Sequence, residues 1–124
     1  MTDDEFFARV GDCSLAPAQF NHRGHVRLAW ICLQRYELEA AVGAACTMLA
    51  AYAASLGAAG KFHRTMTEAL MRLQWPRRRL AWPAFAEAGA GLAAELARCY
   101  SGSLLASDAA RARFVAPDLA PLPA

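Results

Sequence analysis

The sequence has very few of the residues that favour β-strands. Its 124 residues include four valines and one isoleucine, and nowhere do β-branched residues alternate with polar ones as they do along a strand. Alanine and leucine, both strong helix formers, supply most of the 56% apolar content. We therefore expect an all-α protein. The length is that of one domain, so we expect a single compact bundle of five or six helices over residues 1–124.

The sequence also lacks a C-x-x-C pair and a basic leader. The first five residues, Met1–Glu5, are acidic, unlike a secretory or mitochondrial leader, and we expect a cytoplasmic protein. Widely spaced cysteines in such a protein predict reduced thiols, most of them in the core, and not a disulfide framework or a zinc knuckle. The four cysteines are Cys13, Cys32, Cys46 and Cys99.

The sequence also has no large excess of charge of either sign. The net charge is +2, with four basic and six acidic groups in residues 1–60 and nine and five in residues 61–124. This asymmetry is too mild to indicate nucleic-acid binding, and no nucleic-acid-binding motif surrounds the one basic run, Arg77–Arg79. The run is either a solvated loop between helices or a patch for a phosphate or carboxylate ligand.

No long leucine-rich run is present. The longest weakly polar stretch, Ala40–Ala59, is rich in alanine and is broken by Gly43, Thr47, Ser55 and Gly57. This composition predicts a buried helix and not a membrane span. Alanine-rich faces also allow close packing between helices, so a homodimer is left open.

Apolar spacing and helix-capping residues predict six helices. Asn21 and Ser107 are good N-cap residues, Pro83 suits a first helical position, and Gly57 suits a helix end. The helices are expected at residues 3–10, 21–35, 37–55, 62–74, 83–100 and from 107 to before 117. The proline-rich tail, 117–124, has no helical period.

Spacing by three and four residues places all three histidines on apolar faces. His22 and His25 begin the stripe of the second helix, and His63 begins that of the fourth. We therefore expect all three imidazoles to point inward. Glu68 lies about 140° around the helix from His63, which predicts a position away from this face. The stripes are His22, His25, Val26, Ala29, Cys32, Leu33 and Tyr36, and His63, Met66, Thr67, Leu70, Leu73 and Gln74.

Three inward imidazoles predict a shared site. Burial favours their neutral form, which binds metals or accepts protons. His22 and His25 at positions i and i+3 can hold one divalent transition metal ion, and His63 from a neighbouring helix would complete a set with an open position for water. A mixed set would borrow Asp12, Asp108 or the Thr67 hydroxyl. A metal-free acid–base or ligand site, a haem with one axial imidazole, and purely structural histidines are the alternatives.

Several polar residues are candidates for supporting roles. Thr65 and Thr67 either hydrogen-bond a ligand or bond within their helix. Ser107 is most simply an N-cap, whereas Arg111 and Arg27 are candidates for binding negative charge on a ligand.

Three motifs resemble those of a family of small bacterial helical proteins to which no activity is assigned. The family pattern is F-x-H-x-x-H-x-R-x-A-W, then Y/F-H-x-T-x-T, then S-x-x-A-R and P-D-L; this sequence has Phe62 where tyrosine is usual. The resemblance implies functional positions at His22, His25, His63, Thr65, Thr67, Ser107 and Arg111. The matching segments are Phe20–Trp30, Phe62–Thr67, Ser107–Arg111 and Pro117–Leu119.

These observations lead to three function hypotheses. The first is a small enzyme, with or without a metal ion, acting on a small polar or anionic metabolite by hydrolysis, hydration or isomerisation, or by oxygen chemistry if a redox-active metal is bound, with His22, His25, His63 and Thr67 as ligands or catalytic groups. The second is a binding protein or accessory subunit for metal, haem or a small ligand. The third is a structural or interaction module, with alanine-rich helix faces supporting a dimer. None of the three involves nucleic acid or a membrane.

Overall fold

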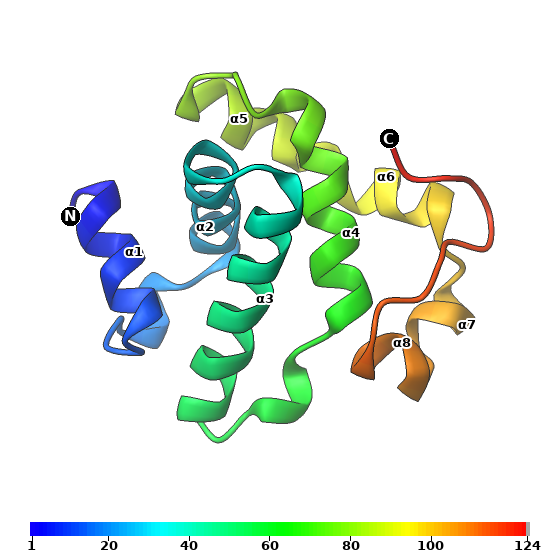
Figure 1. Cartoon of the computed structure of the whole chain (residues 1–124), viewed down its shortest axis with the longest axis horizontal. Helices are drawn as coiled ribbons and strands as arrows, with labels where there is room; N and C mark the ends of the chain where they lie inside the picture. Colours follow the sequence, from blue (N-terminus) through cyan, green and yellow to red (C-terminus); the bar gives the residue numbers. More distant parts are fainter. Residues whose placement is uncertain (124) are drawn as a thin grey trace. The chain divides into compact units, whose positions relative to one another are not determined.

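A computed structural model describes residues 1–123, and it confirms the all-α prediction: these residues contain helices and no strand (Figure 1). The chain divides into two compact units, Met1–Phe62 and His63–Ala124. The α-helices are α1 (Asp3–Gly11), α2 (His22–Arg35), α3 (Leu38–Ser55), α4 (Arg64–Gln74), α5 (Trp82–Ala88), α6 (Leu92–Cys99), α7 (Gly102–Leu105) and α8 (Asp108–Ala112). The 3₁₀ turns are η1 (Pro17–Gln19), η2 (Ala59–Lys61), η3 (Trp75–Arg77) and η4 (Gly89–Gly91).

The first unit is built from α1, α2 and α3, and Figure 1 shows α2 and α3 side by side. Aromatic rings join α1, the segment before α2 and α3: Phe20 lies 4.8 Å from Tyr52 and 6.2 Å from Phe6, measured between ring centroids. The buried Tyr52 hydroxyl donates a 2.7 Å hydrogen bond to the carbonyl of Leu15. This bond ties α3 to the loop after α1, so the segment that leads into α2 has a fixed position.

The second unit packs α4 against α6 and α8. Its apolar core is closed by chain that follows the last helix, because partly buried Val115 and Leu122 pack against it. The backbone N–H of Leu119 also donates to the carbonyl of Cys99 at 2.9 Å. The C-terminal segment is therefore an integral part of this unit. The core consists of Ala69, Leu73, Leu92, Leu96, Cys99 and Tyr100.

Residues 1–123 contain more helices than the five or six predicted. The single helix expected over 83–100 is wrong, because the turn at Gly89–Gly91 divides it into α5 and α6. Two glycines within three residues weaken a helix enough for the backbone to tighten into a 3₁₀ turn there. The four-residue helix α7 has too little period to show in the sequence. The remaining predicted starts agree to within two residues, and Asn21 and Ser107 both cap helices as expected.

The alanine-rich helix α3 is less buried than expected. One face packs in the core, and only 28% of the residues of the helix are buried. The buried residues are Ala41, Val42, Ala45, Cys46 and Tyr52. Among the described residues, α3 is long and apolar enough to cross a membrane by length and composition alone. This is weak evidence, since core helices of water-soluble proteins meet the same criterion.

Candidate functional site

His22 and His25 lie on the exposed side of α2, so the prediction that they point inward is wrong. The residues buried in the first turns of α2 are Gly24, Val26 and Leu28. The middle of the predicted stripe is correct, because Val26, Ala29, Cys32 and Leu33 are all buried. The error is confined to the two ends of the helix, where Tyr36 is also exposed.

The chain leading into α2 explains this reversal. Asn21 caps the helix by accepting a 2.9 Å hydrogen bond from the N–H of Gly24. A Cβ atom on Gly24 would lie 3.0 Å from the carbonyl oxygen of Gln19 and 3.2 Å from the Phe20 ring. The preceding segment therefore buries the Gly24 side of the helix, while His22 and His25 on either side of it stay exposed.

His25 is nevertheless held in place. Its imidazole packs on the buried Phe20 ring, with 4.2 Å between ring centroids. Desolvation by these surroundings lowers the pKa of His25 below its usual value of 6.5, and nearby His22 lowers this pKa further. The pair thus consists of two exposed imidazoles on one helical turn, one of which rests on a fixed aromatic ring.

Arg27, a candidate for binding negative charge on a ligand, forms an ion pair with a carboxylate of the protein itself. Its guanidinium donates to the carboxylate of Asp3 at 2.9 Å and to the carbonyl of Met1 at 3.0 Å. The same group lies 4.6 Å from the centroid of the Phe6 ring. These contacts fasten α1 to α2, and an anionic ligand at Arg27 would have to compete with them.

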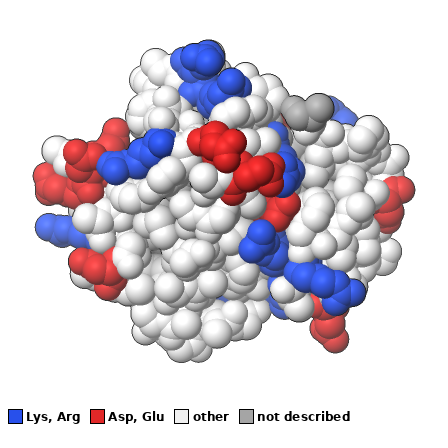
Figure 2. Space-filling view, in the orientation of Figure 1, with Lys and Arg blue, Asp and Glu red and all other residues white. Residues whose placement is uncertain are grey.

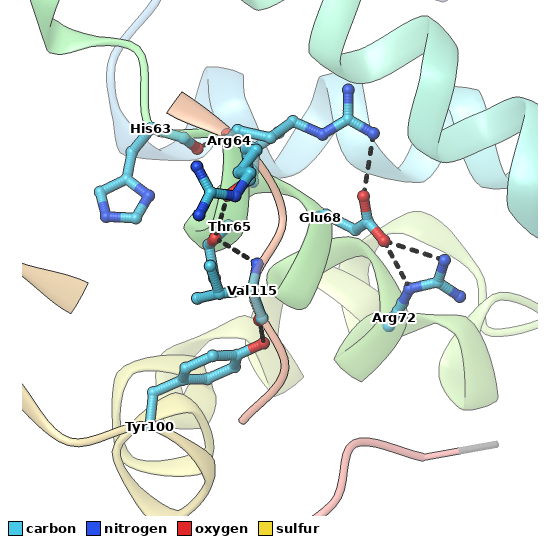
Figure 3. A network of polar contacts seen from close by, with 9 residues as sticks. His63, Arg64, Thr65, Glu68, Arg72, Tyr100 and Val115 are labelled. Atoms are coloured by element: carbon cyan, nitrogen blue, oxygen red, sulfur yellow. Dashed lines mark hydrogen bonds and ion pairs between the residues drawn. The ribbon is translucent and has the colours of Figure 1, made fainter. Parts of the chain in front are cut away.

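His63 is buried, as predicted, and caps the start of α4 (Figure 3). Its Nδ1 accepts a 3.0 Å hydrogen bond from the N–H of Met66, which requires a neutral ring with the proton on Nε2. That Nε2–H donates to the carbonyl of Leu105 at 2.7 Å. Because both ring nitrogens have partners, metal ligation by His63 requires one of these bonds to break.

The two threonines of α4 also bond within the protein. Thr65 is fully buried, and its hydroxyl donates to the carbonyl of Arg113 at 2.7 Å and accepts from the N–H of Val115 at 3.0 Å. Thr67 donates back to the carbonyl of His63 at 2.8 Å, which is the helix-internal alternative foreseen from sequence. The Ser107 hydroxyl caps α8 by accepting from the N–H of Ala110 at 3.1 Å. Arg111 is an exposed residue of that helix.

The burial of Glu68 was not predicted from the sequence, which placed this residue only on another side of α4 than His63. Glu68 is 5% exposed, and two arginines of α4 surround its carboxylate (Figure 3). Arg64 donates at 2.9 Å from one side, while Arg72 donates twice, at 3.0 and 3.1 Å, from the other. The spacing R-x-x-x-E-x-x-x-R was the available signal, since residues four apart on a helix are neighbours.

In the basic run Arg77–Arg79, at least two arginines contact other residues of the second unit. Arg77 donates to both carboxylate oxygens of Glu95, at 3.0 and 3.1 Å. The guanidinium of Arg78 stacks 3.8 Å from the centroid of the Trp75 ring. These contacts favour the structural interpretation of the run over a ligand-binding patch.

The structure bears differently on two predictions, that of buried cysteines and that of a three-histidine metal site. Core placement is confirmed for Cys32, Cys46 and Cys99, and burial raises the pKa of Cys32 to about 12. Within residues 1–123, no group of three or more histidine, cysteine, aspartate or glutamate side chains is arranged to hold a metal ion. The three-histidine ligand set therefore stays a prediction.

Comparison of the chain with protein-family models, with curated proteins and with solved structures gives no match. The resemblance to a bacterial family consequently stays a prediction as well. Any functional conclusion has to be drawn from the side chains themselves.

Proposed function

We propose that this protein binds a divalent transition metal ion through His22 and His25 and uses the bound ion to recognise a small polar or anionic metabolite. The observation that supports this proposal is the pair of exposed imidazoles one helical turn apart on α2. Imidazole is the commonest protein ligand for zinc and also suits copper and nickel. Side chains at positions i and i+3 lie on the same side of a helix and can reach one ion.

Two features of the first unit prepare the pair for binding. The Asn21 cap fixes the first turn of α2, and the Phe20 ring supports the imidazole of His25. Phe20 is itself held by contacts with Phe6 and Tyr52. A ligand pair that is already ordered loses little conformational entropy when the ion binds, which favours affinity.

The ligand class follows from the coordination number. A zinc ion takes about four ligands, so two imidazoles leave positions for water or for an exogenous donor. Carboxylate and other oxygen groups of a small metabolite can fill these positions, with the charge of the ion supplying the attraction. The site would thus select ligands by their ability to coordinate the metal.

The engagement of His63 and Thr67 favours binding without turnover. Both are predicted catalytic groups, yet His63 donates to the carbonyl of Leu105 in α7, and Thr67 donates to the carbonyl of His63, the residue that caps α4. An enzyme would instead depend on water at the open positions of the metal, whose pKa the ion lowers toward neutrality. Hydrolysis or hydration by such a water is the alternative function.

Metal binding can be tested by measuring the metal content of tag-free protein by mass spectrometry and by titrating Zn²⁺, Ni²⁺ and Cu²⁺ into it calorimetrically. We expect one equivalent of metal per chain in the wild type. His22→Ala and His25→Ala should each weaken binding by about tenfold or more, because each removes half of the protein's ligand set. Absence of binding by the wild type for all three ions would overturn the proposal.

His63→Asn is the matched control. Asparagine can retain the cap on α4 by accepting from the backbone, so the variant should fold. If only His22 and His25 bind the ion, His63→Asn keeps wild-type affinity. If it loses affinity as His25→Ala does, the ion is held by three histidines, as the sequence predicted.

A further inference from the structure

After the first turn of α3, where Glu39 is exposed, the exposed residues of this helix are small and uncharged. Between Glu39 and Lys61 the sequence has no charged residue, and Figure 2 shows an almost uncharged surface over this helix. The exposed positions recur at steps of three and four along one side of the helix, as in a helix–helix contact. They are Ala40, Gly43, Thr47, Ala51 and Ala54.

Gly43 has no reason within the chain to be glycine. Apart from its chain neighbours and the backbone of its own helix, a Cβ atom added there would have no neighbour within 4 Å among the described residues, and the backbone is ordinary α-helix. Glycine in the interior of a helix is less favourable than alanine. Such a residue fits a surface to which another backbone comes close.

The two ends of α3 have opposite charge. Glu37 is exposed immediately before the helix, and Lys61 is exposed in the turn that follows it. A second copy of α3 lying antiparallel, with the two-fold axis near Thr47, would bring Glu37 of each copy toward Lys61 of the other. The helix dipoles would also be opposed head to tail, which is favourable.

We propose that α3 is the interface of an antiparallel homodimer with two-fold symmetry. The occupant is a second copy of this chain because the helix and its flanks are complementary to themselves: the exposed side chains in the middle are small and uncharged, exposed Glu37 and Glu39 lie at the start, and exposed Lys61 lies in the turn after the end. A two-fold interface uses the same patch on both subunits, so a self-complementary helix suffices. Small side chains let two helix axes approach to about 8 Å.

The oligomeric state of the full chain, measured by sedimentation velocity over a concentration series, tests this interface. We expect a dimer for the wild type. Ala51→Arg should raise the dimer dissociation constant by about tenfold or more, since it inserts two charges into an uncharged contact. Ala94→Arg, the same change at an exposed alanine of α6, should leave the constant unchanged.

Charge exchange tests the antiparallel orientation. Glu37→Lys and Lys61→Glu should each weaken the dimer about three- to tenfold at low salt, and the double variant should restore it. A parallel dimer or a dimer through another face would not show this restoration, and either would overturn the proposal.

Two further outcomes would also overturn it. One is a wild type that is monomeric throughout the concentration series. The other is a monomer that co-floats with phosphatidylethanolamine–phosphatidylglycerol vesicles and loses this binding in Ala51→Arg, which would identify a membrane surface as the occupant. Circular dichroism of every variant establishes that the fold is retained.

Discussion

His63 and Leu105, 42 positions apart in the chain, are joined by a 2.7 Å hydrogen bond from the imidazole Nε2 to the backbone carbonyl. The other ring nitrogen caps α4 through the N–H of Met66. One side chain thus completes the start of one helix and fastens it to another, and both bonds require the neutral imidazole. His63 is a structural residue of the second unit as well as a candidate for function.

The first prediction separates these two bonds. His63→Ala should lower the free energy of unfolding by about 2–3 kcal/mol, because it removes the cap and leaves two backbone groups without a partner. His63→Asn should lose about half as much, since it keeps an acceptor for the N–H of Met66. Urea denaturation followed by circular dichroism measures both values. Equal losses in the two variants would contradict a capping role.

The second prediction concerns the buried carboxylate of Glu68. Glu68→Gln should reduce the free energy of unfolding by about 2 kcal/mol, because Arg64 and Arg72 would then be left without a compensating charge. Their guanidinium groups are partly exposed, so the loss should fall below that for a fully buried pair. The same change at exposed Glu87 should have almost no effect. Thermal melts of the two variants provide the comparison.

The third prediction concerns how the free energy of unfolding changes at alkaline pH. Tyr100 is buried, its hydroxyl donates to the carbonyl of Val115 at 2.7 Å, and burial followed by the charge of Glu68 raises its pKa to about 12. The folded state therefore favours the neutral phenol. This stabilisation is complete below the unfolded pKa of about 10 and is lost as the pH rises through about 12.

Tyr100→Phe tests this dependence. The variant should be less stable than the wild type by about 1–2 kcal/mol at pH 8, where the Val115 carbonyl loses its partner. The difference should shrink above about pH 10, because the wild type alone pays to keep the phenol protonated. Chemical denaturation at several pH values gives the difference directly. A constant difference would show that Tyr100 does not have a raised pKa.

The fourth prediction concerns the backbone after α1. Cys13 has φ of 65°, in the left-handed region that glycine adopts most readily, and its N–H donates to the carbonyl of Val10 at 3.1 Å to end the helix. Cys13→Gly should raise the free energy of unfolding by about 0.5–1 kcal/mol. Cys13→Ala removes the thiol but keeps the strain, so it should give no gain. A gain in both variants would point to the thiol instead.

Local signals in the sequence were sufficient for most of the helices. Caps such as Asn21 and Ser107 act through their own side chains on the next three residues, so they can be recognised without knowledge of the fold. The break at Gly89–Gly91 could have been inferred from its two glycines. Which side chains at a helix end are buried could not be inferred from the sequence, because their burial depends on contacts with segments distant in the chain.

His22, His25 and Glu68 illustrate this limit. The turn before α2 covers the side occupied by Gly24, and no periodicity within the helix reveals that contact. Glu68 is buried although it is charged, because Arg64 and Arg72 satisfy its carboxylate. Helical periodicity treats every charged residue as solvated, so it fails where charges are buried together.

The hydrogen bonds of Thr65 have a consequence for biosynthesis. Its two partners, the carbonyl of Arg113 and the N–H of Val115, follow it by 48 and 50 residues. Since translation proceeds from the N-terminus, α4 is made among the first segments of its unit and must wait for almost the last to complete it. Until residues 113–115 have left the ribosome, the Thr65 hydroxyl lacks both of its native partners, so the start of α4 cannot reach its final packing while the chain is still being made.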